Sequence, residues 1–356
     1  MTAGRTALTL ALAVLGGGLF QAAGLPAALL TGAMVAVAGA ALAGLPLHLP
    51  NPLSTAAFIM LGLTMGTGVT PDTLHRMATW PLSMVLLAAS MVGCLVLCSL
   101  WLERVHGWDR ATARFAAIPG ALGPVLVLAA ESRADLMRVA LAQSLRLFTL
   151  VAVMPRVLEA LAAAPAGGVP AVADAGSEPL ELVLVGAACT ATAAVFHRLR
   201  APGGVMMGAM LASAVLYGSG IASHRLPDWL LTVSFVVTGA VIGVRFRGVT
   251  PRALLGALRP SLESVGLALA LTAAFAAAGS ALLGLPFGQL WLAYAPGGVE
   301  AMTIVAFALG LDVAFVATHH VVRFAGLGLL TPWWQPAAAP PSPPPPPPPQ
   351  GAGEPP

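Results

Sequence analysis

Long apolar runs separated by short polar turns make up most of the sequence. An α-helix needs about 20 apolar residues to cross the hydrocarbon core of a bilayer. Several runs reach this length and others are shorter, so we predict an all-α, polytopic integral membrane protein in which some helices are broken or cross only half of the bilayer. The twelve runs cover residues 6–23, 25–44, 53–69, 80–102, 114–130, 137–158, 180–197, 202–221, 229–245, 261–284, 287–310 and 313–331.

The composition supports a lipid environment. Hydrophobic residues are 58% of the chain and charged residues 9%, whereas a soluble domain carries about 25% charged residues. The net charge of +3 comes from arginine alone, because the sequence has no lysine. The arginines are scattered over short loops, as topology signals are, and form no patch for nucleic acid. We therefore expect the lipid bilayer as a partner and no nucleic acid.

The second half of the chain repeats the first in register. Most equivalent residues lie 177 positions apart, and the shared segments extend from residues 24–34 and 200–210, which are offset by 176, to the two signature segments at 116–146 and 293–323. The equivalent pairs are Gly62 and Gly239, Gly66 and Gly243, Pro119 and Pro296, Gly120 and Gly297, Asp135 and Asp312, Gln143 and His320, and Arg146 and Arg323. A near half-length offset indicates an internal duplication. We predict two homologous repeats of about five to six helices each.

The repeats divide the chain into four parts. We place the first membrane repeat at residues 1–160 and the second at 180–334. Residues 161–179 between them are rich in Ala, Pro and Gly, as a linker is. Residues 335–356 form a polyproline tail, which we expect to be disordered because such a sequence has no face to pack into a core.

Each repeat has a Pro-Gly step inside an apolar run. Pro119-Gly120 falls in the first repeat and Pro296-Gly297-Gly298 in the second. Proline removes a backbone donor and glycine permits unusual dihedral angles. In lipid, freed backbone groups are tolerated only where protein or a water-lined cavity satisfies them. We predict a broken helix at each step, with a half-helix end facing a solute; a simple kink is the alternative.

One aspartate and one arginine per repeat are costly residues in so apolar a chain. Asp312 and Arg323 share a helical face but lie about 16 Å apart along the axis, so they cannot pair with each other. Each needs another partner: the opposite repeat, a helix end or a ligand. As alternatives, Asp135 and Asp312 can cap the helices that follow them, and the arginines can extend to the membrane surface.

We assign candidate roles from side-chain chemistry. Arg146 and Arg323 would bind an anion or balance buried acids. Asp135, Asp312 and Glu300 are candidate coupling residues, and Glu300 follows the second Pro-Gly step, where the first repeat has Gly123. His319 or His320 would carry a proton, since imidazole titrates near neutral pH. The histidine spacing favours no metal site, and we find no cofactor motif.

The two signature segments read PGA...D...VA..QS.R and PGGVEAM...G.DVAFVATHH.VR, and the segments at residues 24–34 and 200–210 both end in Gly-Ala-Met. With these segments the chain resembles the bacterial AbrB-type membrane protein family. The resemblance covers about residues 10–330. It implies an internally duplicated, multi-pass protein of the bacterial inner (plasma) membrane. The family carries two labels, ammonia monooxygenase and regulator of gene expression. The first would need a metal or flavin site, for which the residues show no motif.

From the repeat architecture we predict a secondary carrier of a small polar or anionic solute. A membrane-bound regulator that senses a ligand without turnover and a membrane monooxygenase are the alternatives. We expect an approximate two-fold axis to bring residues 116–146 and 293–323 together. The solute, the coupling ion and the formation of a homo-oligomer stay open.

Overall fold

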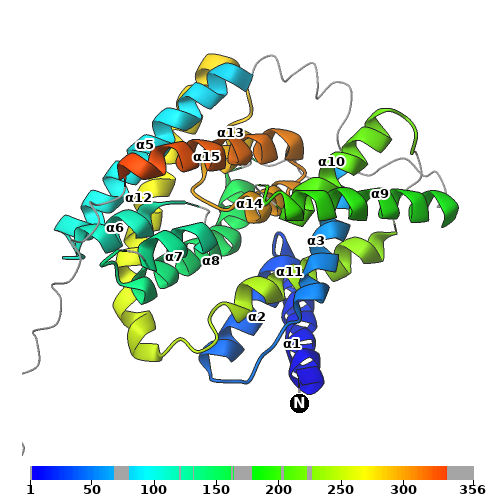
Figure 1. Ribbon diagram of the computed structural model, residues 1–356, viewed down its shortest axis with the longest axis horizontal. Coiled ribbons are helices and arrows are strands. Elements are labelled where there is room, and N and C mark those ends of the chain that lie inside the picture. The colour runs from blue at the N-terminus through cyan, green and yellow to red at the C-terminus, as the bar shows by residue number, and fades with distance from the viewer. Residues whose placement is uncertain are drawn as a thin grey trace, which may run out of the picture.

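The computed structural model describes residues 2–67, 80–119, 122–130, 132–161, 163, 179–201, 204–222 and 227–334. Most of the expected linker and the whole polyproline tail lie outside these residues. Regular structure in the described part of the chain consists of 14 helices and includes no strand (Figure 1). The all-α class is thereby confirmed.

The two repeats contain equivalent helices in the same order. The first repeat comprises α1 (Thr2–Ala22), α2 (Ala28–Leu42), α3 (Asn51–Gly66), α5 (Trp80–Arg104), α6 (Arg110–Ala117), α7 (Leu122–Ala130) and α8 (Leu136–Ala160). The second comprises α9 (Pro179–Arg198), α10 (Gly204–Gly218), α11 (Asp228–Val244), α12 (Pro251–Leu283), α13 (Phe287–Tyr294), α14 (Val299–Ala308) and α15 (Val313–Trp334). Helices α11, α13, α14 and α15 each begin 177 residues after α3, α6, α7 and α8, respectively. The duplication is therefore also seen in the order and the starting positions of the helices along the chain.

Several helices are suited to a bilayer. Within the described residues, α1, α5, α8, α9 and α12 are the five that are long and apolar enough to cross it. Further apolar helices of 10 to 17 residues accompany them. The protein is a multi-pass membrane protein, as the hydrophobic runs predicted.

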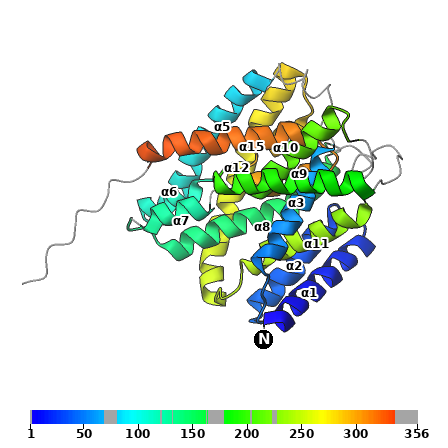
Figure 2. The same ribbon diagram turned by 45° about the vertical axis from the view of Figure 1, so that its right-hand side comes forward.

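The first three helices of each repeat form one bundle, in which α3 packs on α10 and α11 packs on α2 (Figure 2). Paired glycines allow these helices to approach closely. A Cβ atom at Gly62 or Gly66 would collide with the backbone of α10, and one at Gly239 or Gly243 would collide with the backbone of α2. Small residues spaced by four positions are a common contact between membrane helices. We call this group of six helices the glycine-packed bundle.

The remaining helices, α5–α8 and α12–α15, form a second group, which we call the broken-helix bundle. Here α5 packs on α12, α6 on α8, and α13 on α15. Between the two bundles, α2 contacts α8, and a shared apolar core that includes Met34, Leu61, Leu150 and Phe307 fills the junction. Each bundle thus takes the same helices from both repeats (Figure 1).

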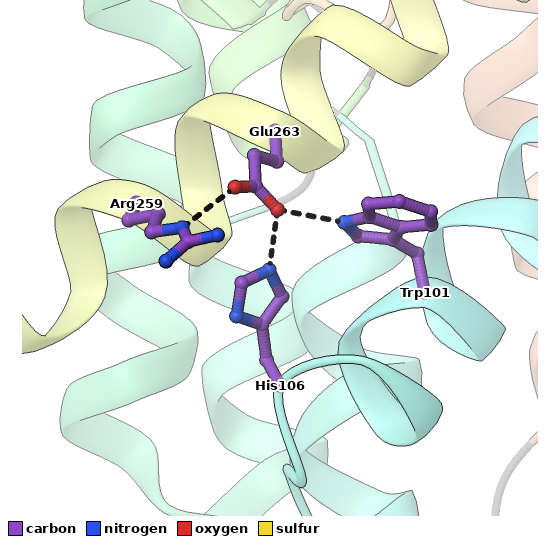
Figure 3. A network of polar contacts seen from close by, with 4 residues as sticks. All are labelled: Trp101, His106, Arg259 and Glu263. Atoms are coloured by element: carbon purple, nitrogen blue, oxygen red, sulfur yellow. Dashed lines mark hydrogen bonds and ion pairs between the residues drawn. The ribbon is translucent and has the colours of Figure 1, made fainter.

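A polar cluster joins the repeats at one end of the broken-helix bundle (Figure 3). The Glu263 carboxylate on α12 accepts hydrogen bonds from Arg259 Nε at 2.8 Å, His106 Nε2 at 2.7 Å and Trp101 Nε1 at 3.2 Å. Trp101 and His106 belong to the end of α5 and the turn after it. The cluster fixes the end of α5 against α12.

Candidate functional site

Both Pro-Gly steps interrupt a helix. In the first repeat α6 ends at Ala117 and α7 begins at Leu122; in the second α13 ends at Tyr294 and α14 begins at Val299. Pro119 and Pro296 lie in these breaks, and both are buried. The prediction of broken helices is confirmed, and the alternative of a simple kink is wrong. Gly120 lies outside the described residues.

A buried arginine closes the end of each half-helix that precedes a break. Arg146 donates to the carbonyl oxygens of Ala116 at 3.0 Å and Ile118 at 2.7 Å. Arg323 donates through both terminal nitrogens to the carbonyl oxygens of Ala295 and Gly297. Only 8% of Arg146 and 4% of Arg323 is exposed, so neither side chain extends to the membrane surface.

These contacts explain how the bundle accommodates two buried charges. The last carbonyls of a helix have no partner within it, and they carry the negative end of the helix dipole. A planar guanidinium group supplies two N–H donors and a positive charge at that point. The partner that the sequence left undefined is therefore the half-helix end of the same repeat.

Gln143 and His320 bind the same half-helices one turn before the arginines. Gln143 Nε2 donates to Phe115 O at 3.3 Å, and His320 Nε2 donates to Leu292 O at 3.1 Å. The sequence equivalence of Gln143 and His320 therefore also holds for the residues whose carbonyl oxygens they bind, Phe115 and Leu292. Nδ1 of His320 is buried and has no hydrogen-bond partner among the residues that the structure describes. Because Nε2 carries the hydrogen toward a carbonyl, Nδ1 is the unprotonated nitrogen of a neutral ring.

Asp135 and Asp312 cap helices. Asp135 Oδ1 accepts from Arg138 N at 3.1 Å, in the first turn of α8. Asp312 Oδ1 accepts from Phe315 N at 3.0 Å, in the first turn of α15. These are N-cap contacts, and the side chain of Asp135 is 45% exposed. The geometry corresponds to the capping alternative.

Glu300 lies in the first turn of α14 and is half-buried. Its charge interacts with that of Arg245, the exposed residue that ends α11 in the glycine-packed bundle. The two opposite charges therefore act across the junction between the bundles. In the sequence Glu300 stands out but Arg245 does not, because Arg245 is one of several arginines in a loop and could not be distinguished from the others.

His319 belongs to a buried polar cluster that the sequence did not indicate. Its Nε2 lies 2.7 Å from Ser83 Oγ on α5, and its Nδ1 lies 2.8 Å from Phe315 O. The Tyr294 hydroxyl donates to Ser83 O at 2.9 Å. Ser83 is 236 positions from His319, so no local spacing could have revealed the pair. Tyr294, one of two tyrosines in the chain, could have been noticed for its place beside the second break.

The two signature segments meet inside the broken-helix bundle. Helix α8 of the first repeat packs against α14 of the second, and α13 packs against α5. The guanidinium groups of Arg146 and Arg323 are close enough for their charges to repel each other. The thiol of Cys94 on α5 lies within electrostatic range of both. Of the predicted site residues, Gln143, Arg146, His320 and Arg323 thus surround the two breaks, while Asp135 and Asp312 lie at helix starts.

These features define an internally duplicated, multi-pass helical membrane protein with a pair of arginine-closed helix breaks. Residues 29–337 match the family model described as "Transition state regulatory protein AbrB", and the chain belongs to the AbrB family. It is 28% identical over 324 residues to "Putative regulator AbrB" of Escherichia coli (strain K12), covering 88% of this chain and 90% of that protein. It is 29% identical over 275 residues to "Uncharacterized protein YhjN" of Bacillus subtilis (strain 168), covering 68% and 70%, respectively.

Proposed function

We propose that the protein is a secondary carrier of a small polar or anionic solute in the bacterial inner membrane. The observation that carries the proposal is the pair of broken helices in one bundle, each closed by a buried arginine, where α8 of one repeat packs against α14 of the other. In carriers built from repeats, discontinuous helices form the solute site where the repeats meet. The solute would bind between the two breaks.

The charges around the breaks favour an anionic or polar solute. Arg146 and Arg323 are both positive, and the helices α7 and α14 begin just after the breaks. The N-terminus of a helix attracts negative charge through its free N–H groups and its dipole. Each guanidinium group has five N–H donors, so it can bind a solute oxygen while it holds the carbonyls of the break.

The division into two bundles supports alternating access. Carriers move one bundle against another around the solute site. Here the glycine-packed bundle is held together by close backbone contacts, and it meets the broken-helix bundle where α2 contacts α8 and at the shared apolar core. A motion at that junction would expose the breaks to either side of the membrane.

A second candidate is a membrane regulator that binds a ligand without transporting it. The name of the Escherichia coli relative favours it. The same pair of breaks would then serve as a sensor site. Binding is common to both candidates, and solute translocation separates them.

The test is uptake by purified protein in liposomes, measured with radiolabelled small carboxylates, phosphate and neutral polar solutes. We expect uptake of at least one anionic solute. Arg323→Ala should abolish it, as should Arg146→Ala. The matched control is Arg156→Ala, because Arg156 lies on the same helix as Arg146 but is 62% exposed and pairs with Glu159.

Three other outcomes change the conclusion. Saturable binding without uptake would support the regulator. Conversion of a solute to an oxidised product would support the monooxygenase alternative. Uptake that is unchanged in Arg323→Ala, in protein that folds normally, would show that the solute site lies elsewhere.

A further inference from the structure

A neutral His319 ring cannot make hydrogen bonds of all its close polar contacts at the same time. Ser83 Oγ donates to Trp80 O at 2.8 Å, and His319 Nδ1 donates to Phe315 O at 2.8 Å, because a carbonyl oxygen only accepts. The remaining 2.7 Å contact joins His319 Nε2 to Ser83 Oγ. All three are hydrogen bonds only if Nε2 also carries a hydrogen, and the ring is then an imidazolium. In a neutral ring with Nδ1–H, the Ser83 hydroxyl must choose between Nε2 and Trp80 O.

Three aromatic rings surround the same imidazole. The Phe315 ring centroid lies 3.9 Å from that of His319 at an interplanar angle of 32°. Trp80 and Tyr294 each lie 6.2 Å away, centroid to centroid. The face of an aromatic ring attracts a cation within about 6 Å. The surroundings therefore favour a positive ring, while complete burial of the side chain disfavours it.

The neighbouring histidine has the opposite character. A proton added to Nδ1 of His320 would find no acceptor in the described part of the chain, since that buried nitrogen has no hydrogen-bond partner there. His320 is thus suited to remain neutral and to hold the end of α13 through Leu292 O.

We propose that His319 is the proton-binding site of the carrier, with Ser83 as the residue that positions its proton. This inference rests on the proposed function and specifies the coupling ion. In the neutral state the Ser83 hydroxyl donates to Nε2. A proton that arrives binds the lone pair of Nε2; the new N–H donates to Ser83 Oγ, and the hydroxyl turns to Trp80 O. The groups that face the ring are the phenol of Tyr294 from α13, Ser83 and Trp80 from α5, and Phe315 from its own helix. The adjacent His320 is the other titratable group whose charge acts on it.

Proton binding would tighten the contact between the repeats. Ser83 lies on α5 of the first repeat and His319 on α15 of the second, and the Tyr294 hydroxyl, just before the break between α13 and α14, holds the Ser83 carbonyl. The protonation state of one ring is thereby connected to the second break. The first repeat has Ala142 where the second has His319, and Ala117 where it has Tyr294, so only one of the two breaks has this connection.

The test is the titration of His319 in nanodiscs, followed by NMR of 15N-labelled histidine and assigned with the His319→Gln variant. We expect both ring nitrogens of His319 to become protonated as the pH falls, with Nε2 the site of change. Ser83→Ala should lower the pH of half-protonation by about one unit, because the hydrogen bond of Ser83 to the charged ring is stronger than its hydrogen bond to the neutral ring. Ser90→Ala is the matched control, because Ser90 lies on the same helix, is buried and donates to Leu87 O at 2.8 Å without a histidine partner.

A ring that stays neutral from pH 4 to pH 9, or an equal effect of Ser83→Ala and Ser90→Ala, would overturn the proposal. Solute uptake by liposomes that moves no protons would overturn it as well, while leaving the carrier function intact. Conversely, a Ser83-dependent titration in protein that takes up no solute would argue against the carrier and not against the proton site.

Discussion

At the residue scale, the two buried arginines are retained in spite of their cost. An arginine near the centre of a bilayer costs about 2.5–3.5 kcal/mol on insertion scales. Here each arginine donates two hydrogen bonds to carbonyls that the helix break has freed. The break and the arginine therefore stabilise each other, since either alone would leave buried polar groups without partners.

Replacement of these arginines by lysine tests the geometry. A lysine keeps the charge but is a point-like ammonium that cannot reproduce the planar fork. We expect the melting temperature of the purified protein to fall in the order wild type, Arg146→Lys, Arg146→Ala, and the same order at Arg323. If the Lys variants melt like the wild type, the positive charge alone is sufficient and the fork geometry has no importance.

The two aspartates offer a separate test at this scale. Asparagine caps a helix about as well as aspartate, whereas alanine in place of an N-cap costs about 0.5–2 kcal/mol. Asp135→Asn and Asp312→Asn should therefore preserve both stability, measured by thermal unfolding, and uptake, whereas the alanine variants should be less stable. Loss of uptake in a stable Asp312→Asn protein would restore this carboxylate as a coupling residue.

The sequence revealed only part of the site, for physical reasons. Arg146, Arg323, Gln143 and His320 stood out because the duplication repeats their spacing. The partners of the arginines could not be recognised in the sequence. They are backbone carbonyls, and a residue of any type can supply a backbone carbonyl. Ser83 was missed because a serine in an apolar helix is common and its partner lies on a distant helix.

At the element scale, the repeat and the apolar runs predicted the helices well, and Pro119 and Pro296 predicted the two breaks. The helix partners were not predictable. A short helix that is apolar on all sides has no polar face to indicate which side packs against protein. The paired glycines stood out only as equivalent positions of the repeat, and the exchange of partners between repeats, α3 with α10 and α11 with α2, depends on the assembled bundle.

Substitution of the paired glycines tests this contact. A methyl group at Gly62 would collide with the carbonyl oxygen of Met206, and one at Gly239 with that of Leu30. We expect Gly62→Ala and Gly239→Ala to lower the melting temperature by separating the helices. Gly39→Ala on α2 is the control, since a Cβ there meets nothing within 4 Å and alanine favours the helix. Equal melting of all three variants would contradict the close packing.

At the scale of the whole molecule, the arrangement separates a bundle held by backbone contacts from a bundle that contains the breaks. Each bundle draws the same helices from both repeats. A duplication therefore produces two unlike bodies, each internally paired, and not two repeats side by side. Motion between the bodies would leave the pairing of the repeats within each one intact.

The charges of Arg245 and Glu300 test that motion, because they act on each other from opposite bundles. If their attraction stabilises one arrangement of the bundles, Arg245→Gln and Glu300→Gln should each change the uptake rate. The double variant should then resemble either single one, because two residues that act as a pair are not additive. Arg252→Gln, an exposed arginine at the start of α12, should leave the rate unchanged. Additive effects of Arg245→Gln and Glu300→Gln would mean that the two charges act independently, and the junction would then move without this contact.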